Sequence, residues 1–292
     1  MEQEITLAAP AKVNLTLDIL GQRADGYHEL ESVMQQITLF DFITLRRSEH
    51  GLQLYCSHPL VPEGADNIAY QAALLMLEKL DSSVGLEISI EKNIPVGAGL
   101  AGGSTDAAAV LMGINTLMEL DLSLPELMAA GSQLGSDIPF CIQGGTALAR
   151  GRGEIITPLP AGPVLQLVLV KPDFSLSTAE VYRRFRMEKV GQRPGLDAFL
   201  AAWTQYDMIN MVENMTNVLE TVTLSLCPEI QTIKQELMDS GAIQAIMSGS
   251  GPTVFGVFPD LKTAGIAYQK MQQQYKEIFL ATSYYGGDAN EN

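Results

Sequence analysis

Apolar and polar side chains alternate strictly along residues 10–19, and Lys12 and Asn14 lead the polar side. This alternation is the pattern of a β-strand that buries one face. The polar face has two interpretations at this point, a solvated surface or the wall of a binding site. Comparable apolar patterns predict further strands at residues 5–7, 30–39, 42–45, 52–56, 86–91, 144–153, 164–171, 244–247 and 254–258.

Apolar residues that recur every three or four positions predict the helices. Asn67 is expected to cap a helix that runs to residue 80, and Ser177 with Glu180 forms a capping box before a helix that carries Tyr182. The segment from residue 284 onward is rich in acidic and small residues and is expected to fray. Further helices are predicted at residues 105–119, 124–134, 196–226, 229–238 and 262–275.

Proline and glycine gather at residues 159–163, where the composition of the chain changes. A chain of 292 residues has room for one large domain or two ordinary ones. The change in composition favours two domains, residues 1–160 and residues 161–292. The sequence shows no internal repeats.

The charge balance restricts the classes of partner. The chain has 34 acidic and 18 basic residues and a formal charge of −16, which disfavours non-specific binding to nucleic acid or to an anionic membrane. Its apolar runs are too short to span a bilayer and its first residues lack a signal-peptide pattern, so we expect a cytoplasmic protein. The three cysteines lack C-x-x-C spacing and suggest neither disulfides nor a zinc site. A phosphorylated substrate is still possible, given local compensation by backbone N–H groups and a few basic side chains.

Residues 95–106 are chemically the most informative stretch, with glycines at positions 97, 99, 102 and 103. Glycine allows backbone angles closed to other residues and leaves the main-chain N–H groups open to a ligand. Ser104, Thr105 and Asp106 suit the cap or first turn of a helix, whose N-terminus attracts anions. An ordinary flexible turn is the alternative. We predict a phosphate-binding loop formed by Pro95, Val96, Gly97, Ala98, Gly99, Leu100, Ala101, Gly102, Gly103, Ser104 and Thr105.

Two common nucleotide motifs do not describe this loop. No lysine follows its last glycine, so the loop is not a Walker A P-loop. Its glycines do satisfy G-x-G-x-x-G, but a dinucleotide fingerprint follows a continuously apolar parallel strand. The preceding residues 86–92 alternate between apolar and polar, so the dinucleotide motif is a weak match.

Three other features are compatible with ordinary structure when each is taken alone. Tyr27 and His28 end a loop rich in glycine and aspartate, which is typical of an exposed surface. Asp137 lies between a predicted helix and an apolar segment with a proline, where a capping aspartate is common. Residues 248–252 form a second glycine-rich turn, which enters an apolar strand.

Taken together, residues 10–15, 95–105 and 248–252 resemble, in order and spacing, the three motifs of the GHMP kinase superfamily of small-molecule kinases. The similarity spans nearly the whole chain. It implies an α+β fold, with an N-terminal domain like the second domain of ribosomal protein S5 and a C-terminal ferredoxin-like domain. The site would lie in the cleft between them. Ala98 and Ala101 stand where some relatives carry glycine, and the family pattern tolerates small residues there.

The resemblance also implies roles in phosphoryl transfer from ATP. Asp137 would be the general base for an acceptor hydroxyl, and Lys12 the cation near that hydroxyl and the γ-phosphate. The glycine loop would hold the ATP phosphates, with Ser104 or Thr105 in contact with phosphate or Mg²⁺, and Asn67 would lie near adenine. Mg²⁺ would be carried mainly by ATP oxygens and water, and no protein ligand is assigned to it.

The loop that ends in Tyr27 and His28, and the segment around Asp137, resemble one branch of the superfamily. Its acceptor is a cytidine diphosphate-linked methylerythritol, phosphorylated on the 2-hydroxyl in non-mevalonate isoprenoid biosynthesis. Tyr27 and Tyr182 would stack on the cytosine, His28 would read its edge, and Asn14 is a candidate for the erythritol or phosphate part. The alternatives are a kinase for mevalonate, homoserine or a sugar, and a non-catalytic nucleotide-binding relative. The chain could act as a monomer or a homodimer.

Overall fold

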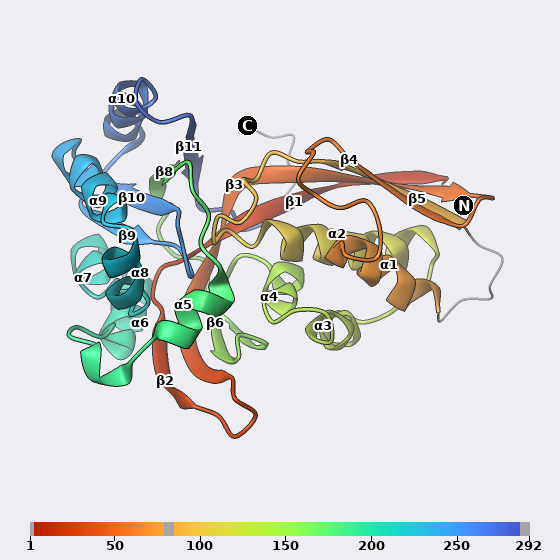
Figure 1. The fold of residues 1–292 in the computed structure, drawn as a ribbon, viewed down its shortest axis with the longest axis horizontal. Helices are drawn as coiled ribbons and strands as arrows, with labels where there is room; N and C mark the ends of the chain where they lie inside the picture. The colour runs from red at the N-terminus through yellow and green to blue at the C-terminus, as the bar shows by residue number, and fades with distance from the viewer. Residues whose placement is uncertain (1–2, 79–84, 287–292) are drawn as a thin grey trace.

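The computed structural model describes residues 3–78 and 85–286, and within these ranges the first half of the chain forms a seven-stranded sheet (Figure 1). Its strands are β1 Glu4–Asn14, β2 Asp18–Gln22, β3 His28–Ser48, β4 Leu52–Cys56, β5 Gly85–Glu91, β6 Thr146–Gly151 and β7 Ile155–Pro158. The long strand β3 pairs antiparallel with β1, β2, β5 and β6. At the two ends of the sheet, β4 pairs parallel with β5 and β7 pairs antiparallel with β6.

Helices α1 Ile68–Leu77, α2 Gly102–Leu117, α3 Leu124–Ser132 and α4 Ile138–Gln143 lie on one face of this sheet (Figure 1). The side chains of α2 that face the core are mostly small or apolar, so the helix approaches β1 and β3 closely. At Gly113 a Cβ would lie 2.4 Å from Leu45 Cδ1, which leaves room only for hydrogen. This close packing holds α2 against the sheet, and the Lys12 N–H, which donates to the Leu100 carbonyl at 3.1 Å, ties the glycine loop to β1.

The second half forms an antiparallel sheet in the order β11-β8-β10-β9. Its strands are β8 Gln166–Lys171, β9 Gln244–Met247, β10 Val254–Phe258 and β11 Glu277–Thr282. Helices precede β9 and separate β10 from β11, which gives the β-α-β-β-α-β succession of a ferredoxin-like domain. The two sheets and their helices confirm the predicted α+β class. The helices are α5 Thr178–Arg184, α6 Leu196–Thr204, α7 Met208–Glu213, α8 Glu220–Leu226, α9 Glu229–Asp239 and α10 Leu261–Met271, with a 3₁₀ turn at Met187–Lys189.

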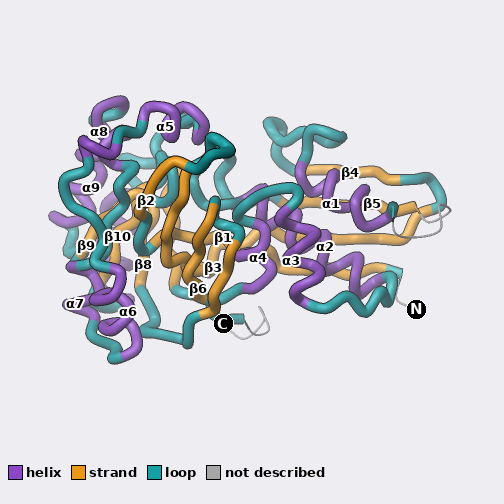
Figure 2. The backbone as a smooth tube through the Cα atoms, turned by 90° about the horizontal axis from the view of Figure 1, so that it is seen from below, coloured by secondary structure: helices purple, strands orange, loops and turns teal. Residues whose placement is uncertain are grey.

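One apolar core is shared by the two sheets. Val13 and Leu15 from the first half pack in the same cluster as Leu167 of β8 and Trp203 of α6, and Figure 2 shows β1, β3 and β6 beside β8. The indole of Trp203 donates a hydrogen bond to the Pro160 carbonyl at 3.0 Å. The division of the chain at residue 160 falls between β7 and β8, and it stays a prediction because both halves contribute to this core.

Several predicted elements differ from the structure. The strands expected at 30–39 and 42–45 are one continuous strand, and the helical segment 196–226 is three short helices. Helix α2 begins at Gly102 rather than at 105, and α1 ends at Leu77, while residues 79–80 of its predicted span lie outside the described residues. The strand expected at 10–19 is interrupted, since β1 ends at Asn14 and β2 begins at Asp18. The sequence pattern did not predict α4, β7, β11 or the 3₁₀ turn Met187–Lys189.

The predicted fraying from residue 284 is wrong for Tyr284 itself. Its backbone N–H donates to the Gln36 carbonyl at 2.8 Å, and its carbonyl accepts from Gln35 Nε2 at 3.0 Å. These bonds tie the end of the second sheet to β3. Residues 287–292 lie outside the described residues. Across residues 3–78 and 85–286, no helix combines the length and the apolar character needed to cross a bilayer.

Candidate active site

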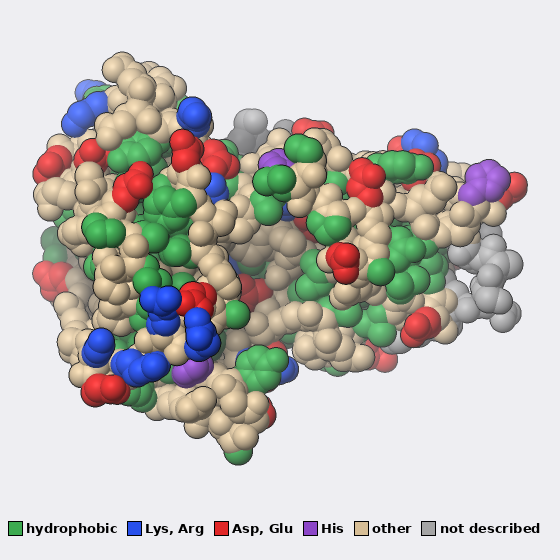
Figure 3. Space-filling view, in the orientation of Figure 1, with side chains coloured by type: hydrophobic (Ala, Val, Ile, Leu, Met, Phe, Trp, Pro, Cys, Tyr) green, Lys and Arg blue, Asp and Glu red, His purple; other side chains and the backbone are tan. Residues whose placement is uncertain are grey.

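A cavity of about 1290 Å³ lies where the two halves meet, and Figure 3 shows the surface hollowed between them. Its walls come from β1, the glycine loop, the connection before α4, α5 and the turn after β9. Pockets for one small ligand usually hold about 300–1,000 Å³, so this one has room for two ligands side by side. Every candidate named from the sequence lines it except Thr105, which is buried.

Lys12 and Asp137 meet inside this cavity. Lys12 Nζ lies 3.4 Å from Asp137 Oδ2, and the lysine side chain is 5% exposed against 30% for the aspartate. Asp137 directly precedes α4, but its carboxylate makes no capping hydrogen bond within the described structure. The capping interpretation of Asp137 is therefore wrong. A half-open carboxylate beside a buried ammonium group is suited to accept a proton from a hydroxyl group that enters the cavity.

A chain of hydrogen bonds fixes Lys12. Its Nζ donates to Asn14 Oδ1 at 2.8 Å, Asn14 Nδ2 donates to Ser32 Oγ at 2.8 Å, and Ser32 Oγ donates to the Thr16 carbonyl at 2.5 Å. Lys12 and Asn14 are 4% and 1% exposed. The polar side of the first strand is thus the wall of a site, and the solvated interpretation is wrong.

The glycine loop turns through three positions with positive φ. These are Gly97 at +64°, Gly99 at +77° and Ala101 at +57°, and Ala101 is the residue before α2. Ser104 and Thr105 lie in the first turn of this helix, which confirms one of the two predicted alternatives. The other, a cap formed by a hydroxyl or carboxylate side chain, is wrong, because the helix has already begun at Gly102. The N–H groups of its first turn are therefore available to an anion in the cavity. Ser104 also lines the cavity.

The turn at residues 248–251 packs on this loop from the other half of the molecule. Ser248 Oγ donates to the Gly99 carbonyl at 3.0 Å, and Thr253 N–H donates to the Ala98 carbonyl at 3.3 Å. A Cβ at Gly249 would lie 3.3 Å from Asn14 Oδ1. The three motifs named from the sequence therefore form one continuous surface.

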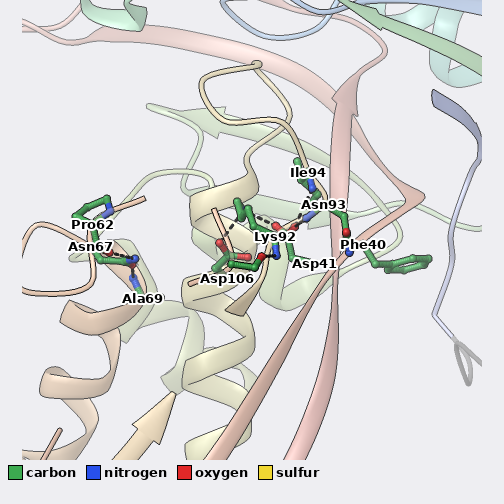
Figure 4. Close-up of polar contacts among 10 residues, drawn as sticks. Phe40, Asp41, Pro62, Asn67, Ala69, Lys92, Asn93, Ile94 and Asp106 are labelled. Atoms are coloured by element: carbon green, nitrogen blue, oxygen red, sulfur yellow. Dashed lines mark hydrogen bonds and ion pairs between the residues drawn. The ribbon is translucent and has the colours of Figure 1, made fainter. Parts of the chain in front are cut away.

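A buried cluster of three ionisable side chains supports the glycine loop, and no sequence motif indicates it. Lys92 Nζ contacts carboxylate oxygens of Asp41 and Asp106, the latter at 2.7 Å, and all three side chains are at most 4% exposed (Figure 4). Asp41 Oδ1 also accepts from the backbone N–H groups of Asn93 and Ile94, at 2.6 and 2.8 Å. The cluster ties β3 and the end of β5 to the first turn of α2.

Asp106 is expected to make the stability of the protein depend on pH. Burial raises its pKa to about 8, with Lys92 opposing and Asp41 reinforcing the shift. An aspartate with a raised pKa in the folded state stabilises the fold below its ordinary pKa, and that contribution is lost as the pH rises toward 8. The free energy of unfolding of Asp106→Asn, measured by urea denaturation, should therefore fall less between pH 5 and pH 9 than that of the parent.

Asp260→Asn is the matched control for this prediction. Asp260 caps α10 at an exposed position, and its hydrogen bond from Thr263 N–H lowers its pKa. Its contribution is present above the ordinary aspartate pKa and is lost only in acid. Parallel curves for the parent and Asp106→Asn between pH 5 and pH 9 would contradict a raised pKa at Asp106.

Asn67 lines one end of the cavity, but its side chain is occupied by the backbone (Figure 4). Its Oδ1 accepts from Ala69 N–H at 2.8 Å, which confirms the predicted cap of α1, and its Nδ2 donates to the Pro62 carbonyl at 2.7 Å. The loop before α1 presents Leu60 and Val61 to the same end. Asn67 thus shapes this end of the cavity by holding the loop, and its place near adenine stays a prediction.

Aromatic residues line the opposite end. The rings of His28 and Tyr182 lie 5.5 Å apart at 45°, and Phe185 meets His28 edge-on at 6.1 Å. Tyr27 is 58% exposed, with the Arg152 guanidinium 5.2 Å from its ring centroid. Burial lowers the pKa of His28, so its imidazole is neutral at pH 7 and has one N–H donor and one nitrogen acceptor.

The basic side chains at this end are not among the residues predicted from the sequence. Arg152, Arg183 and Arg186 line the cavity, and Figure 3 shows Lys and Arg side chains gathered over α5. Arg152 pairs with Glu154 and Arg183 with Glu180, so these guanidinium groups offer N–H donors at this end rather than a large local positive charge. The exposed Arg183 and Arg186 lie on and just after the short helix α5 and belong to no motif, so no local pattern points to them.

Two family models match the chain: GHMP kinases N terminal domain over residues 67–145, and GHMP kinases C terminal over residues 205–277. A relative from Syntrophomonas wolfei, named 4-diphosphocytidyl-2-C-methyl-D-erythritol kinase, is 53% identical over 284 residues, or 97% of this chain and 100% of the relative. The chain belongs to the GHMP kinase family. A second relative of this GHMP kinase comes from Acetivibrio thermocellus and bears the same name. It is 45% identical, over 95% of this chain and 98% of the relative's own length.

Solved structures agree with this family assignment. A crystal structure of 4-(cytidine 5'-diphospho)-2C-methyl-D-erythritol kinase superposes on this GHMP kinase with a TM-score of 0.82 and 34% identity, covering 97% of this chain and 100% of the other. A homoserine kinase from Cytophaga hutchinsonii reaches a TM-score of 0.78 at 20% identity, covering 98% of this chain and 96% of the other. At that identity the similarity concerns the fold alone.

Proposed function

We propose that this chain phosphorylates the 2-hydroxyl of 4-diphosphocytidyl-2-C-methyl-D-erythritol with ATP and releases ADP and the 2-phosphate. It would serve the non-mevalonate route to isoprenoids. The observation that carries the proposal is the Lys12–Asp137 pair, which lies beside the glycine loop in a cavity large enough for two ligands. The relatives of 53% and 45% identity bear the name of this kinase.

Asp137 acts as the general base in this proposal. Its partly exposed carboxylate accepts the proton of the acceptor hydroxyl as that oxygen attacks phosphorus. Lys12 is held by Asn14 and lies 3.4 Å from Asp137, so its ammonium group can orient the hydroxyl and offset negative charge on the transferring group. Lys12 is held by Asn14 before the ligand arrives, which limits the reorganisation that the reaction needs.

The glycine loop and the first turn of α2 suit the phosphates of ATP. Positive φ at Gly97 and Gly99, and the open N–H groups of the helix start, form a backbone cradle without intervening side chains. Bound ATP supplies the phosphoryl group, and Mg²⁺ offsets its charge. The described residues contain no group of three His, Cys, Asp or Glu side chains able to hold a metal. Because Mg²⁺ dehydrates reluctantly, we assign it to ATP oxygens and water, with the Ser104 hydroxyl, which lines the cavity, as a candidate contact.

The aromatic end suits the cytosine of the acceptor. Tyr27 and Tyr182 would stack on the two faces of the base, each contact worth about 1–3 kcal/mol, and neutral His28 can read its edge. Asn14 would meet the erythritol or phosphate part. We also propose the cytoplasm as the location of the enzyme, residues 1–160 and 161–292 as its domains, and a monomer or homodimer as its state.

ADP release by the purified chain tests this function. We expect turnover with Mg²⁺-ATP and 4-diphosphocytidyl-2-C-methyl-D-erythritol, and none with mevalonate or homoserine. CDP should compete with the acceptor, because it carries the base and diphosphate that the aromatic end would bind. ADP formed with a rival acceptor would contradict the substrate while keeping the kinase chemistry, and no ADP with any acceptor would favour a non-catalytic relative.

A further inference from the structure

Asn217 lies outside the three motifs at residues 10–15, 95–105 and 248–252, yet its side chain makes three hydrogen bonds to the backbone. Its Nδ2 donates to the carbonyls of Met247 and Gly249, at 2.8 and 2.7 Å, and its Oδ1 accepts from Leu219 N–H at 3.0 Å. The residue is 2% exposed. Only the bond to Leu219 is local, since the other two reach 30 and 32 residues along the chain. Both long-range bonds end on the segment that carries the third glycine motif.

The backbone around Asn217 is itself fixed. Leu17 N–H donates to the Thr216 carbonyl at 2.9 Å, and Val218 N–H donates to the Leu17 carbonyl at 3.0 Å. Leu17 lies between β1, which carries Lys12, and β2. Asn217 is therefore anchored to the strand segment that follows Lys12, and from there it holds the turn at residues 248–251.

A second side chain supports the same turn from the next helix. Glu220 Oε1 accepts from Met247 N–H at 2.7 Å, while its Oε2 accepts from Lys234 Nζ at 2.5 Å. Residue 247 is thus held through its N–H by Glu220 and through its carbonyl by Asn217. Beyond this point the chain continues into Gly249, whose carbonyl is held by Asn217 as well.

The turn fixed in this way touches reactive parts of the proposed site. It contacts the Gly99 carbonyl through Ser248 Oγ, and a Cβ at Gly249 would come within 3.6 Å of Lys12 Nζ. Asn217 itself does not line the cavity. Any effect of Asn217 on the reaction must therefore pass through the turn.

We propose that Asn217 is a positioning residue for phosphoryl transfer: it holds the turn at residues 248–251 against the glycine loop and Lys12. The inference rests on the proposed kinase function. A displacement of about 1 Å in a reacting geometry can cost about 10²-fold in rate. Losing the two long-range bonds frees the turn to move by such a distance, so the loss should affect kcat more than substrate affinity.

The experiment compares Asn217→Ala and Asn217→Thr with the control Asn115→Ala. Threonine nearly keeps the volume of asparagine and one donor, which guards against loss of folding. Asn115 makes the same kind of contact at the far end of α2, where its side chain bonds both the N–H and the carbonyl of Leu122. The measurements are kcat, both KM values, the melting temperature and amide hydrogen exchange of Thr253 and Gly251.

We expect kcat of Asn217→Ala to fall about 10²-fold and that of Asn217→Thr about tenfold, with KM within about threefold. Exchange at Thr253 and Gly251 should quicken at least tenfold in the Asn217 variants, because these amides bond Ala98 and Ser248 across or within the turn. Asn115→Ala should lower the melting temperature and leave kcat and these two amides unchanged.

A fall in melting temperature of the Asn217 variants without a fall in kcat would reduce Asn217 to a structural role and overturn the proposal. If the parent chain fails to use the cytidyl acceptor, it is the proposed function that fails. The hydrogen-exchange measurement needs no substrate, so it still tests whether Asn217 holds the turn at residues 248–251. Unchanged exchange at Thr253 would show that the amide does not hold the turn.

Discussion

Asp137→Asn is expected to slow phosphoryl transfer by at least ~10²-fold, the scale of a lost general base, while both KM values stay within a few-fold. Asparagine keeps the size of the side chain and one oxygen that Lys12 can contact, so the shape of the cavity should not change. What it loses is the ability to accept the hydroxyl proton. Steady-state ADP release with saturating ATP and acceptor measures this effect directly.

Asp207→Asn separates this effect from the general loss of a carboxylate. Asp207 caps α7 at a partly exposed position and accepts from Asn210 N–H at 3.2 Å, outside the cavity lining. Its variant should keep parental kcat. If Asp137→Asn also kept parental kcat, Asp137 would not be the base, and another group would have to take the proton.

The main parts of the site could be predicted because short stretches of sequence carry them. The strand alternation placed Lys12 and Asn14 on one face, and four glycines before an alanine-rich run marked the anion-binding loop. These signals depend on neighbours within a few positions. Periodicity could not decide whether the polar face of this strand is solvated or buried, because burial depends on what packs against the face. Here the turn at residues 248–251 packs against it.

The missed residues act over long distances in the sequence. Lys92 meets Asp41 across 51 positions, and Asn217 meets Gly249 across 32. Neither pairing leaves a local pattern, because each residue type is compatible with an ordinary surface position in its own segment. Short elements were not predicted for a related reason. In a six-residue helix such as α4, the spacing of apolar residues cannot be distinguished from that of a strand.

Gly99→Ala is expected to destabilise the fold by about 2–5 kcal/mol and to raise the KM for ATP at least ~10-fold. Its φ of +77° is strained for alanine, at a cost of about 1–2 kcal/mol. In addition, the new Cβ would lie 2.4 Å from the Ser248 carbonyl oxygen, so the glycine loop and the turn must separate. Urea denaturation and ATP titration of the initial rate measure the two effects.

Gly51→Ala isolates the backbone term of this prediction. Gly51 has nearly the same φ, +76°, but it lies on an exposed turn, and a Cβ there would meet nothing within 4 Å. Its variant should therefore lose about 1–2 kcal/mol of folding stability, from backbone strain alone, and keep the parental KM for ATP. The excess loss in Gly99→Ala then measures the contact between the two halves of the molecule. Equal losses of stability in the two variants would mean that the glycine loop and the turn separate at no cost. If the KM for ATP of Gly99→Ala were also unchanged, the close approach at Gly99 would have no part in holding ATP.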